Sequence, residues 1–323
     1  MSAARITLAI ACMAMLSACI KEELPVPAYP RGDAREVRFC MGQGYQMQYW
    51  VDLGSGEAVR ENTLMAWDLA FEGGPEGWRI MLNGGRLMLA WDTGLPVIDA
   101  AVDVQQTALQ GRFDAASGHP DSTAIGDWRN TRPLIVIDMG YDAQGNPIGH
   151  RRIRPVEVSA SAYTLELAQA DGSDAVIVSV PKDPQRHWTH FAFGQGALQV
   201  APSNGQWHIV LTRYTHFFAE DDLPYLVVGA FIDGAHTRVL RLPDADFATV
   251  ELADTLGHPF LRRRDIIGYD WKEYDFDAGR YEVDARRVYI LQVSDGRFFK
   301  LRFLDYYGTS GQAGCPLFAV QAL

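Results

Sequence analysis

Large apolar side chains occupy every second position in many short segments of this chain. The alternation is clear in residues 65–71 and again in residues 207–211, and both segments contain a tryptophan. Successive side chains of an extended strand point to opposite faces, so each segment predicts a strand that buries its large side chains on one face. Nowhere does a helical period continue for more than about three turns. The pattern therefore predicts a fold that is predominantly β.

Glycine-containing turns separate pairs of these segments. In residues 49–59, 190–200 and 274–283, an aromatic-rich strand leads into a glycine turn and then into a strand that returns to valine. Asp171-Gly172 and Asp295-Gly296 each follow a further apolar strand. Glycine adopts the positive φ that tight turns between antiparallel strands require. We therefore expect a β-hairpin at each of these positions.

These landmarks occur twice in the same order. In each half of the chain a hairpin is followed by a tryptophan strand, then by an Ile-Gly pair, an apolar strand and an Asp-Gly turn. A recurrence of this kind indicates repeated structural units. We expect an all-β protein with two related antiparallel β modules, at residues 36–183 and 184–323, whose spacings differ through loop insertions.

The N-terminus has the features of a bacterial lipoprotein signal. Arg5 precedes a short apolar stretch that ends in Leu16-Ser17-Ala18-Cys19, as in a signal peptide that is cleaved after small residues. We expect residues 1–18 to be removed and Cys19 to carry the lipid that anchors the protein to the outer membrane. The alternative is an ordinary signal peptide with an incidental cysteine. Residues 19–35 are charged and rich in proline, which predicts a flexible tether.

The charge of the chain limits its partners. Lys and Arg number 29 against 40 Asp and Glu, which gives a formal net charge of −11. Proteins that bind nucleic acid through its phosphates present a basic surface. The composition therefore argues against nucleic acid as a partner, and against adhesion to anionic lipid by charge alone.

Several segments together resemble the strand-and-loop signature of the HmuY-like haem-binding lipoproteins. The matching segments are residues 67–71, 82–85, 207–214, 224–229, 267–272, 288–291 and 295–303. They extend over nearly the whole chain after the tether and are most specific from about residue 185 onward. The resemblance implies an all-β, lipid-anchored protein that captures haem, passes it to a TonB-dependent receptor of the outer membrane and performs no chemistry of its own.

The resemblance also directs attention to particular residues. In the family, one iron-ligating histidine lies in the segment that matches residues 271–279, which contains no histidine here. The other ligand lies in the region that matches residues 232–266, where His236 and His258 are the histidines. We take these two as candidate axial ligands. Arg262, Arg263 and Arg264 follow His258 and are the candidate partners of the haem propionates. A turn histidine and a solvated basic run are the simpler interpretation of the same residues.

Two cysteines remain in the folded part of the chain, Cys40 and Cys315. A secreted protein is exposed to conditions that permit disulfides, so they could form a bridge that closes a very long loop. Two buried thiols are the alternative. No spacing of cysteines and histidines indicates a zinc site, and the identity of any metal ligand other than those above is left open.

Motifs of the common enzyme classes are absent from the sequence, which contains no GxSxG, HExxH or P-loop pattern. We therefore expect a protein that is not an enzyme. Two hypotheses follow. The first is a lipoprotein that captures haem or a similar planar iron complex. The second is an accessory surface protein that docks on a receptor through its β-edges or loops and holds no small molecule.

Overall fold

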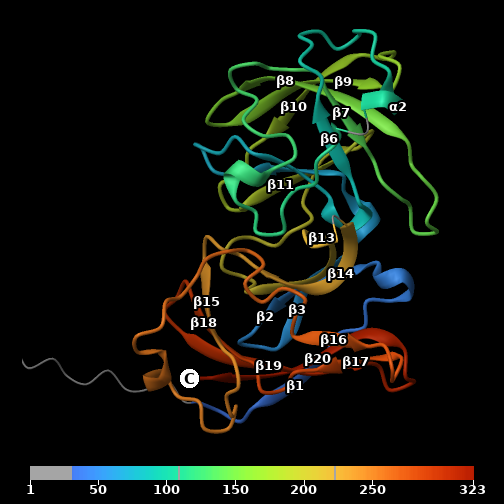
Figure 1. The fold of residues 1–323 in the computed structure, drawn as a ribbon. Coiled ribbons are helices and arrows are strands. Elements are labelled where there is room, and N and C mark those ends of the chain that lie inside the picture. Colours follow the sequence, from blue (N-terminus) through green and yellow to red (C-terminus); the bar gives the residue numbers. More distant parts are fainter. Residues whose placement is uncertain (1–30, 108–109, 222) are drawn as a thin grey trace, which may run out of the picture. The chain divides into compact units, whose positions relative to one another are not determined.

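The structure is a computed structural model that describes residues 31–107, 110–221 and 223–323. The predicted signal peptide, the predicted lipidation at Cys19 and the first part of the predicted tether lie outside the described residues. Residues 31–323 form one compact unit. Its regular structure consists almost entirely of antiparallel strands (Figure 1), so the predicted all-β fold is confirmed.

Two sheets enclose the larger hydrophobic core. The first is a five-stranded sheet in the order β1-β20-β19-β18-β15, with bounds Arg35–Arg38, Ala313–Ala322, Phe298–Tyr307, Val288–Val293 and Thr237–Leu242. The second is a four-stranded sheet in the order β14-β13-β2-β3, with bounds Leu223–Ile232, Ile209–Phe218, Met47–Asp52 and Glu57–Thr63. Side chains such as Ile209 and Leu211 from the second sheet pack against Leu291 and Phe303 from the first.

Two further sheets enclose a second core. The four-stranded sheet β12-β11-β4-β5 has bounds Gly196–Leu198, Trp188–Ala192, Leu69–Glu72 and Ile80–Leu82. The five-stranded sheet β10-β9-β8-β7-β6 has bounds Val176–Pro181, Ala162–Gln169, His150–Val158, Ile135–Asp138 and Leu89–Asp92. Phe71 and Phe191 of the smaller sheet pack against Ile137 and Tyr163 of the larger one.

The remaining elements are short. A separate hairpin joins β16 (Lys272–Asp275) to β17 (Arg280–Val283). The described helical segments are η1 (Gln43–Tyr45), η2 (Leu64–Ala66), η3 (Gly84–Arg86), α2 (Val104–Thr107), η5 (Pro120–Ser122) and η6 (Leu252–Thr255). Among the described residues, no helix has the length and apolar character needed to cross a bilayer.

Strand pairing divides the chain at other positions than 183/184, the predicted boundary between modules. Strands from residues 35–63 and 209–322 pair with one another, while strands from residues 69–198 form the other two sheets. The middle of the chain is thus built into its own pair of sheets, between two segments that pair with each other. The predicted boundary falls between β10 and β11, and β11 pairs with β4 across it.

Each predicted hairpin is present. Strands β2–β3, β11–β12 and β16–β17 form the three glycine-turn hairpins, and β9–β10 and β18–β19 form the two that turn at Asp-Gly. The prediction that each tryptophan shares a face with the rest of its strand is wrong. Trp67 and Trp207 precede β4 and β13 and pack in a third cluster, with Trp50, whereas Leu69 and Ile209 enter the two cores.

Cys40 and Cys315 form a disulfide with a Cα–Cα distance of 3.9 Å. Cys40 follows β1 and Cys315 lies in β20, which is the pairing partner of β1. The bridge therefore fastens the end of a ladder that joins the first described strand to the last.

Candidate functional site

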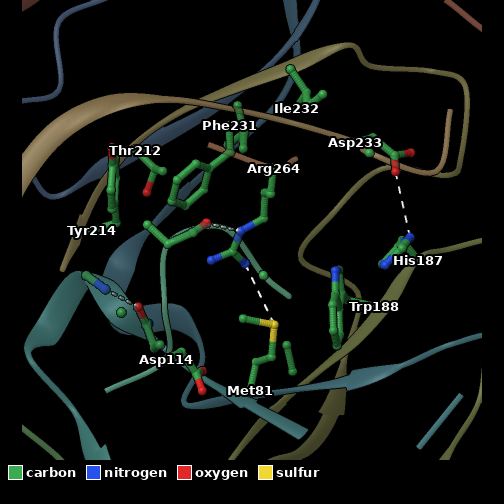
Figure 2. Close-up of a pocket in the computed structure, with 18 of the residues that line it drawn as sticks. Met81, Asp114, His187, Trp188, Thr212, Tyr214, Phe231, Ile232, Asp233 and Arg264 are labelled. Carbon is green, nitrogen blue, oxygen red and sulfur yellow. Dashed lines mark hydrogen bonds and ion pairs between the residues drawn. The ribbon is translucent and has the colours of Figure 1, made fainter. Parts of the chain in front are cut away.

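A cavity of about 320 Å³ lies between the two four-stranded sheets. Its volume is in the lower part of the range of about 300–1,000 Å³ that is usual for small-molecule sites. Figure 2 shows residues that line it, among them Arg264, Met81, Phe231 and Tyr214. Trp67 and Trp207, the tryptophans of the two predicted strands, both line the cavity.

One wall of the cavity is a row of three residues in neighbouring strands. His190 of β11 pairs with Ala70 of β4, and Ala70 pairs with Met81 of β5. Residues paired across antiparallel strands have side chains on the same face. All three line the cavity, while their chain neighbours Phe191, Leu69 and Ile80 face the core behind the sheet. The alternation of the strands thus separates core from cavity.

The opposite wall is built in the same way by the other four-stranded sheet. Val210 of β13 pairs with Trp50 of β2 on one side and with Phe231 of β14 on the other. These three and Tyr214 line the cavity or pack in the cluster beside it. The cavity is therefore bounded by large aromatic side chains on a rigid support.

Amide side chains fix the aromatic walls. The indole Nε1 of Trp67 donates to Oε1 of Gln48 at 3.1 Å, and Nε1 of Trp50 donates to Oδ1 of Asn62 at 2.8 Å. Gln48 in turn donates to Oγ1 of Thr212 at 2.7 Å. Each indole N–H has a partner at its polar end, so the apolar faces of the rings are held beside the cavity.

The loop at η3 closes one side of the cavity. Asn83 donates through Nδ2 to the carbonyl oxygens of Leu64 and Trp67, at 2.7 and 2.8 Å. A Cβ atom at Gly85 would lie 2.7 Å from a methyl group of Leu64, so the backbone can approach only because glycine has no side chain. Nε of Arg213 donates to the carbonyl oxygen of Gly85 at 2.9 Å. The loop is thereby attached to β13.

Four arginines and two aspartates line the cavity, although the chain as a whole is strongly acidic. The arginines are Arg79, Arg213, Arg262 and Arg264, and the aspartates are Asp114 and Asp233. Arg79 pairs with Glu72 at 2.5 Å. Within the part of the chain that the structure describes, Arg213, Arg262 and Arg264 bind backbone carbonyl oxygens and form no ion pair with a carboxylate. These three guanidiniums therefore have no direct carboxylate partner among the described residues, although the carboxylates of Asp114 and Asp233 also line the cavity.

Arg264 extends into the cavity (Figure 2). Its Nε donates to the carbonyl oxygen of Ala116 at 3.2 Å, and its Nη1 lies 3.8 Å from Sδ of Met81. The guanidinium carbon lies 4.3 Å from the ring centre of Phe231. Burial raises the pKa of the nearby Asp114 carboxyl to about 6, against the opposing effects of two backbone N–H donors and Arg264.

His190 is 4 % exposed and lies edge-on to two indoles, with ring centres 4.7 Å from Trp67 and 6.2 Å from Trp50. Its Nδ1 is buried and has no hydrogen-bond partner. Burial lowers the pKa of His190 to about 3, so the imidazole is neutral at physiological pH. A neutral imidazole without a partner is able to accept a metal ion.

Two further histidines approach one carboxylate, His187 from the cavity and His236 from a neighbouring depression. Nδ1 of His236 is 2.7 Å from Oδ2 of Asp233, and Nδ1 of His187 is 3.7 Å from Oδ1 of the same carboxylate. Figure 2 shows the contact between His187 and Asp233. Burial lowers the pKa of His187, while Asp233 opposes this effect. Both imidazoles are thus directed at a carboxylate.

The structure brings some of the sequence-predicted residues to the cavity and leaves others outside it. Arg262 and Arg264 line it. Arg263 is exposed and pairs with Asp265 at 2.6 Å. His258 is on an exposed loop, and His236 lines a neighbouring depression. Neither candidate histidine lines the cavity.

Sequence reasoning missed His190 as a candidate. It lies three residues after His187, and on a strand that spacing directs the two side chains to opposite faces, so they cannot bind one metal ion together. The pairing of β4 with both β11 and β5, which places His190 and Met81 on one face with Ala70 between them, is not visible in the sequence. Among the described residues, no group of three or more His, Cys, Asp or Glu side chains is placed to hold a bare metal ion.

Comparisons with known proteins give matches by structure but not by sequence. No family model and no curated protein matches the sequence. An apo HmuY analogue from Tannerella forsythia matches with a TM-score of 0.23 and 12% identity, over 47% of this chain and 85% of that one. Apo PinO from Porphyromonas gingivitis matches with a TM-score of 0.33 and 9% identity, over 90% of this chain and 99% of that one.

A third match is a proposed HmuY-like haem-binding protein from Bacteroides vulgatus, with a TM-score of 0.22 and 10% identity, over 53% of this chain and 90% of that one. The structural matches are thus to HmuY-like proteins, the group that the sequence motifs indicate, at low sequence identity.

Proposed function

We propose that this protein is a lipid-anchored binding protein of the outer membrane that captures haem in the cavity between its four-stranded sheets and passes it to a TonB-dependent receptor. The observation that carries the proposal is the composition of the cavity. Aromatic rings form its walls, and three of its arginines have no carboxylate partner among the described residues.

The arginines favour an anionic ligand. A cation removed from water is costly unless an opposite charge compensates it. Arg213 and Arg264 are partly buried and have only carbonyl oxygens as hydrogen-bond acceptors, apart from the weak contact of Arg264 to a thioether. Arg262 also binds carbonyl oxygens but is exposed to solvent, so this cost does not apply to it. A ligand carboxylate would form a charge-assisted bond with a guanidinium, roughly twice as strong as a neutral hydrogen bond. Haem brings two such carboxylates on its propionates.

The aromatic walls favour a planar, largely apolar ligand. Five aromatic side chains line the cavity: Trp50, Trp67, Trp207, Tyr214 and Phe231. Amide partners hold the two indoles of Trp50 and Trp67 in place, so little side-chain entropy is lost when a ligand binds. A porphyrin combines the large apolar surface that such walls stabilise with anionic groups at one edge.

The experiment that tests the proposal is a titration of the purified full-length protein with haem, followed by absorbance in the Soret region. We expect a saturable shift with a stoichiometry of one haem per chain. The comparison is an unrelated acidic protein under the same conditions. If the two proteins change the spectrum of haem to the same extent, the proposal is wrong.

A docking protein without a small-molecule ligand is the second candidate. It is favoured by aromatic side chains that extend into solvent near the ends of β-hairpins. Phe276, between β16 and β17, is 88% exposed, and Tyr225 of β14 is 54% exposed. Retained receptor binding by a protein that shows no Soret shift would support this candidate over haem capture.

A further inference from the structure

We infer that the cavity is also a binding site for compact planar aromatic carboxylic acids, with Arg264 bound to the carboxylate and His190 bound to a polar group at the far end of the ring. This inference goes beyond the proposed function and rests on the cavity alone, whether or not haem binds there. It adds a second class of ligand, one that is much smaller than a porphyrin.

The size and lining of the cavity set the class of ligand. Its volume of about 320 Å³ is close to the lower limit of about 300 Å³ for small-molecule sites. Trp50 and Phe231 line it from one sheet, and Ala70 lines it from the facing sheet. Aromatic rings pack well against one another in stacked and edge-on arrangements. A compact ligand with a planar ring therefore suits the space.

Arg264 supplies a cation at one end of the cavity. Its guanidinium packs on the ring of Phe231, and its Nη1 faces only the sulfur of Met81, at 3.8 Å (Figure 2). A thioether is a weak hydrogen-bond acceptor, whereas a carboxylate is a strong one for a guanidinium. The carboxylate of Asp114 is engaged elsewhere, because its two oxygens accept hydrogen bonds from two backbone N–H groups, at 2.6 and 2.7 Å. A ligand carboxylate can therefore take the place beside Nη1.

The other arginines that line the cavity are less suited to this role. Arg79 pairs with Glu72 at 2.5 Å. Arg213 donates through both Nε and Nη1 to carbonyl oxygens, at 2.9 and 2.6 Å. Arg262 is exposed to solvent. Arg264 is therefore the arginine that we assign to the carboxylate.

His190 supplies a hydrogen-bonding group at the other end. Its ring forms no hydrogen bond with any described residue, which is unusual for a buried polar group. Nδ1 is fully enclosed and Nε2 is not, so Nε2 is the nitrogen that a ligand can reach. A hydroxyl group can donate to Nε2 or accept from it, so it suits either tautomer of the neutral ring. Edge-on contacts with Trp50 and Trp67 hold the ring in place.

The strand register sets the separation of the two polar ends. His190 pairs with Ala70, and Ala70 pairs with Met81. The backbones of His190 and Met81 are thus two strand spacings apart, roughly 10 Å. Because Arg264 contacts Met81, its guanidinium and the imidazole lie toward opposite sides of the same wall. A planar acid that carries a hydroxyl group at the far end of its ring can contact both while it lies in the cavity above Ala70.

The experiment measures the binding of small probes to the full-length protein by isothermal titration calorimetry. The probes are cinnamate, its neutral analogue cinnamyl alcohol, para-hydroxycinnamate and octanoate. We expect cinnamate to bind at least about tenfold more tightly than the alcohol, and para-hydroxycinnamate to bind about fivefold more tightly than cinnamate. Octanoate should bind more weakly than cinnamate, because it has no ring to pack against the aromatic walls.

Two variants assign the two ends of the ligand. Arg264→Gln should remove the preference for cinnamate over the alcohol and keep the preference for the hydroxyl group. His190→Phe should do the reverse, because a phenyl ring preserves the edge-on contacts but has no nitrogen. Arg263→Gln and His258→Ala change exposed residues and should bind all probes as the wild type does. Each preference compares two probes in one protein, so a general loss of affinity cancels, and the wild type alone tests the inference if a variant fails to fold.

The outcomes are distinguishable. If the wild type binds cinnamate no better than cinnamyl alcohol, or no better than octanoate, the inference is wrong. If Arg264→Gln keeps the preference for cinnamate, or His190→Phe keeps the preference for the hydroxyl group, the role of that residue is overturned. Binding of the aromatic acids without a Soret shift for haem would support this inference and contradict the proposed function. A Soret shift without binding of the acids would do the opposite.

Discussion

Asp68 and Arg86 form a buried ion pair, in which Oδ1 of Asp68 is 2.6 Å from Nη2 of Arg86. The second carboxylate oxygen accepts a hydrogen bond from the backbone N–H of Phe193 at 2.7 Å. Asp68 lies between Trp67 and β4, and Arg86 ends η3, so the pair joins the two segments that border the cavity. The side chains are 12% and 4% exposed.

Removing one partner should be more harmful than removing both. We expect Arg86→Met to lower the free energy of unfolding by about 3–5 kcal/mol, because it leaves a carboxylate buried without its counter-ion. The double variant Asp68→Leu with Arg86→Met should recover part of this loss. Urea denaturation of the wild type, Arg86→Met, Asp68→Leu and the double variant measures the coupling. A single variant that is as stable as the wild type would contradict the prediction.

Asn83 should hold the cavity loop through its amide. Asp at this position has the same shape but cannot donate to the carbonyl oxygens of Leu64 and Trp67. We expect Asn83→Asp to lower the free energy of unfolding by about 1–3 kcal/mol and to weaken ligand binding, because Trp67 loses its support. Thermal unfolding and haem titration measure the two effects. Asn130→Asp, on an exposed turn, is the matched control and should change neither.

The disulfide between Cys40 and Cys315 should contribute strongly to stability. The two cysteines are 275 residues apart, and a bridge that closes so long a loop restricts the unfolded chain most. We expect the Cys40→Ala, Cys315→Ala double variant to lose about 3–5 kcal/mol of unfolding free energy. Chemical denaturation with and without reductant checks this. Identical curves for the oxidised protein and the double variant would rule out a stabilising role.

Local patterns were sufficient to predict the hairpins, because a turn and its two strands are adjacent in the sequence. The glycine turn after β2 and the Asp-Gly turns after β9 and β18 are all where the sequence places them. The order of strands in the sheets was not predictable in the same way. Pairing of β11 with β4 joins residues more than a hundred positions apart, and no local signal specifies it.

For the same reason, only part of the candidate site could be predicted from the sequence. Arg262 and Arg264 were identified from a basic run next to a histidine, and both line the cavity. His208 shows the opposite case. An alternation counted from Trp207 would place His208 on the solvent face, but it is 3% exposed and accepts a hydrogen bond from the backbone N–H of Leu53 through Nδ1. A bend before β13 displaces the alternation, so a period of two counted from Trp207 gives the wrong face.

Lys272 should make stability depend on pH. Its Nζ donates to the carbonyl oxygen of Val228 at 2.5 Å and lies 4.3 Å from the ring centre of Trp271. Burial lowers its pKa from 10.5 to about 7, although Asp270 opposes this. Between these values the unfolded chain holds a proton that the folded chain lacks, so the free energy of unfolding rises with pH.

We expect the wild type to gain about 2 kcal/mol of unfolding free energy between pH 7 and pH 9 relative to Lys272→Met. The variant has no titrating group at this position, so the difference between the two proteins isolates the lysine. Urea denaturation at the two pH values measures it. If the unfolding free energies of the wild type and Lys272→Met change equally between pH 7 and pH 9, Lys272 stays protonated in the folded protein throughout this range.

Arg264 should recognise the carboxylates of the ligand and not its iron. Its guanidinium makes no ion pair among the described residues and lies between Phe231 and Met81. We expect Arg264→Gln to weaken haem and iron-free protoporphyrin equally, by about tenfold, the loss of about 1.4 kcal/mol of binding free energy. Arg263→Gln, at an exposed arginine that pairs with Asp265, should have no effect.

The dimethyl ester of protoporphyrin makes this prediction specific. The ester keeps the planar apolar body but has no negative charge, so wild type and Arg264→Gln should bind it with the same affinity. The difference between acid and ester, compared between the two proteins, measures the interaction of Arg264 with a propionate, as a double-mutant cycle does for two residues. An equal loss with acid and ester would show that Arg264 supports the shape of the cavity, because only a contact with the carboxylate depends on the ligand charge.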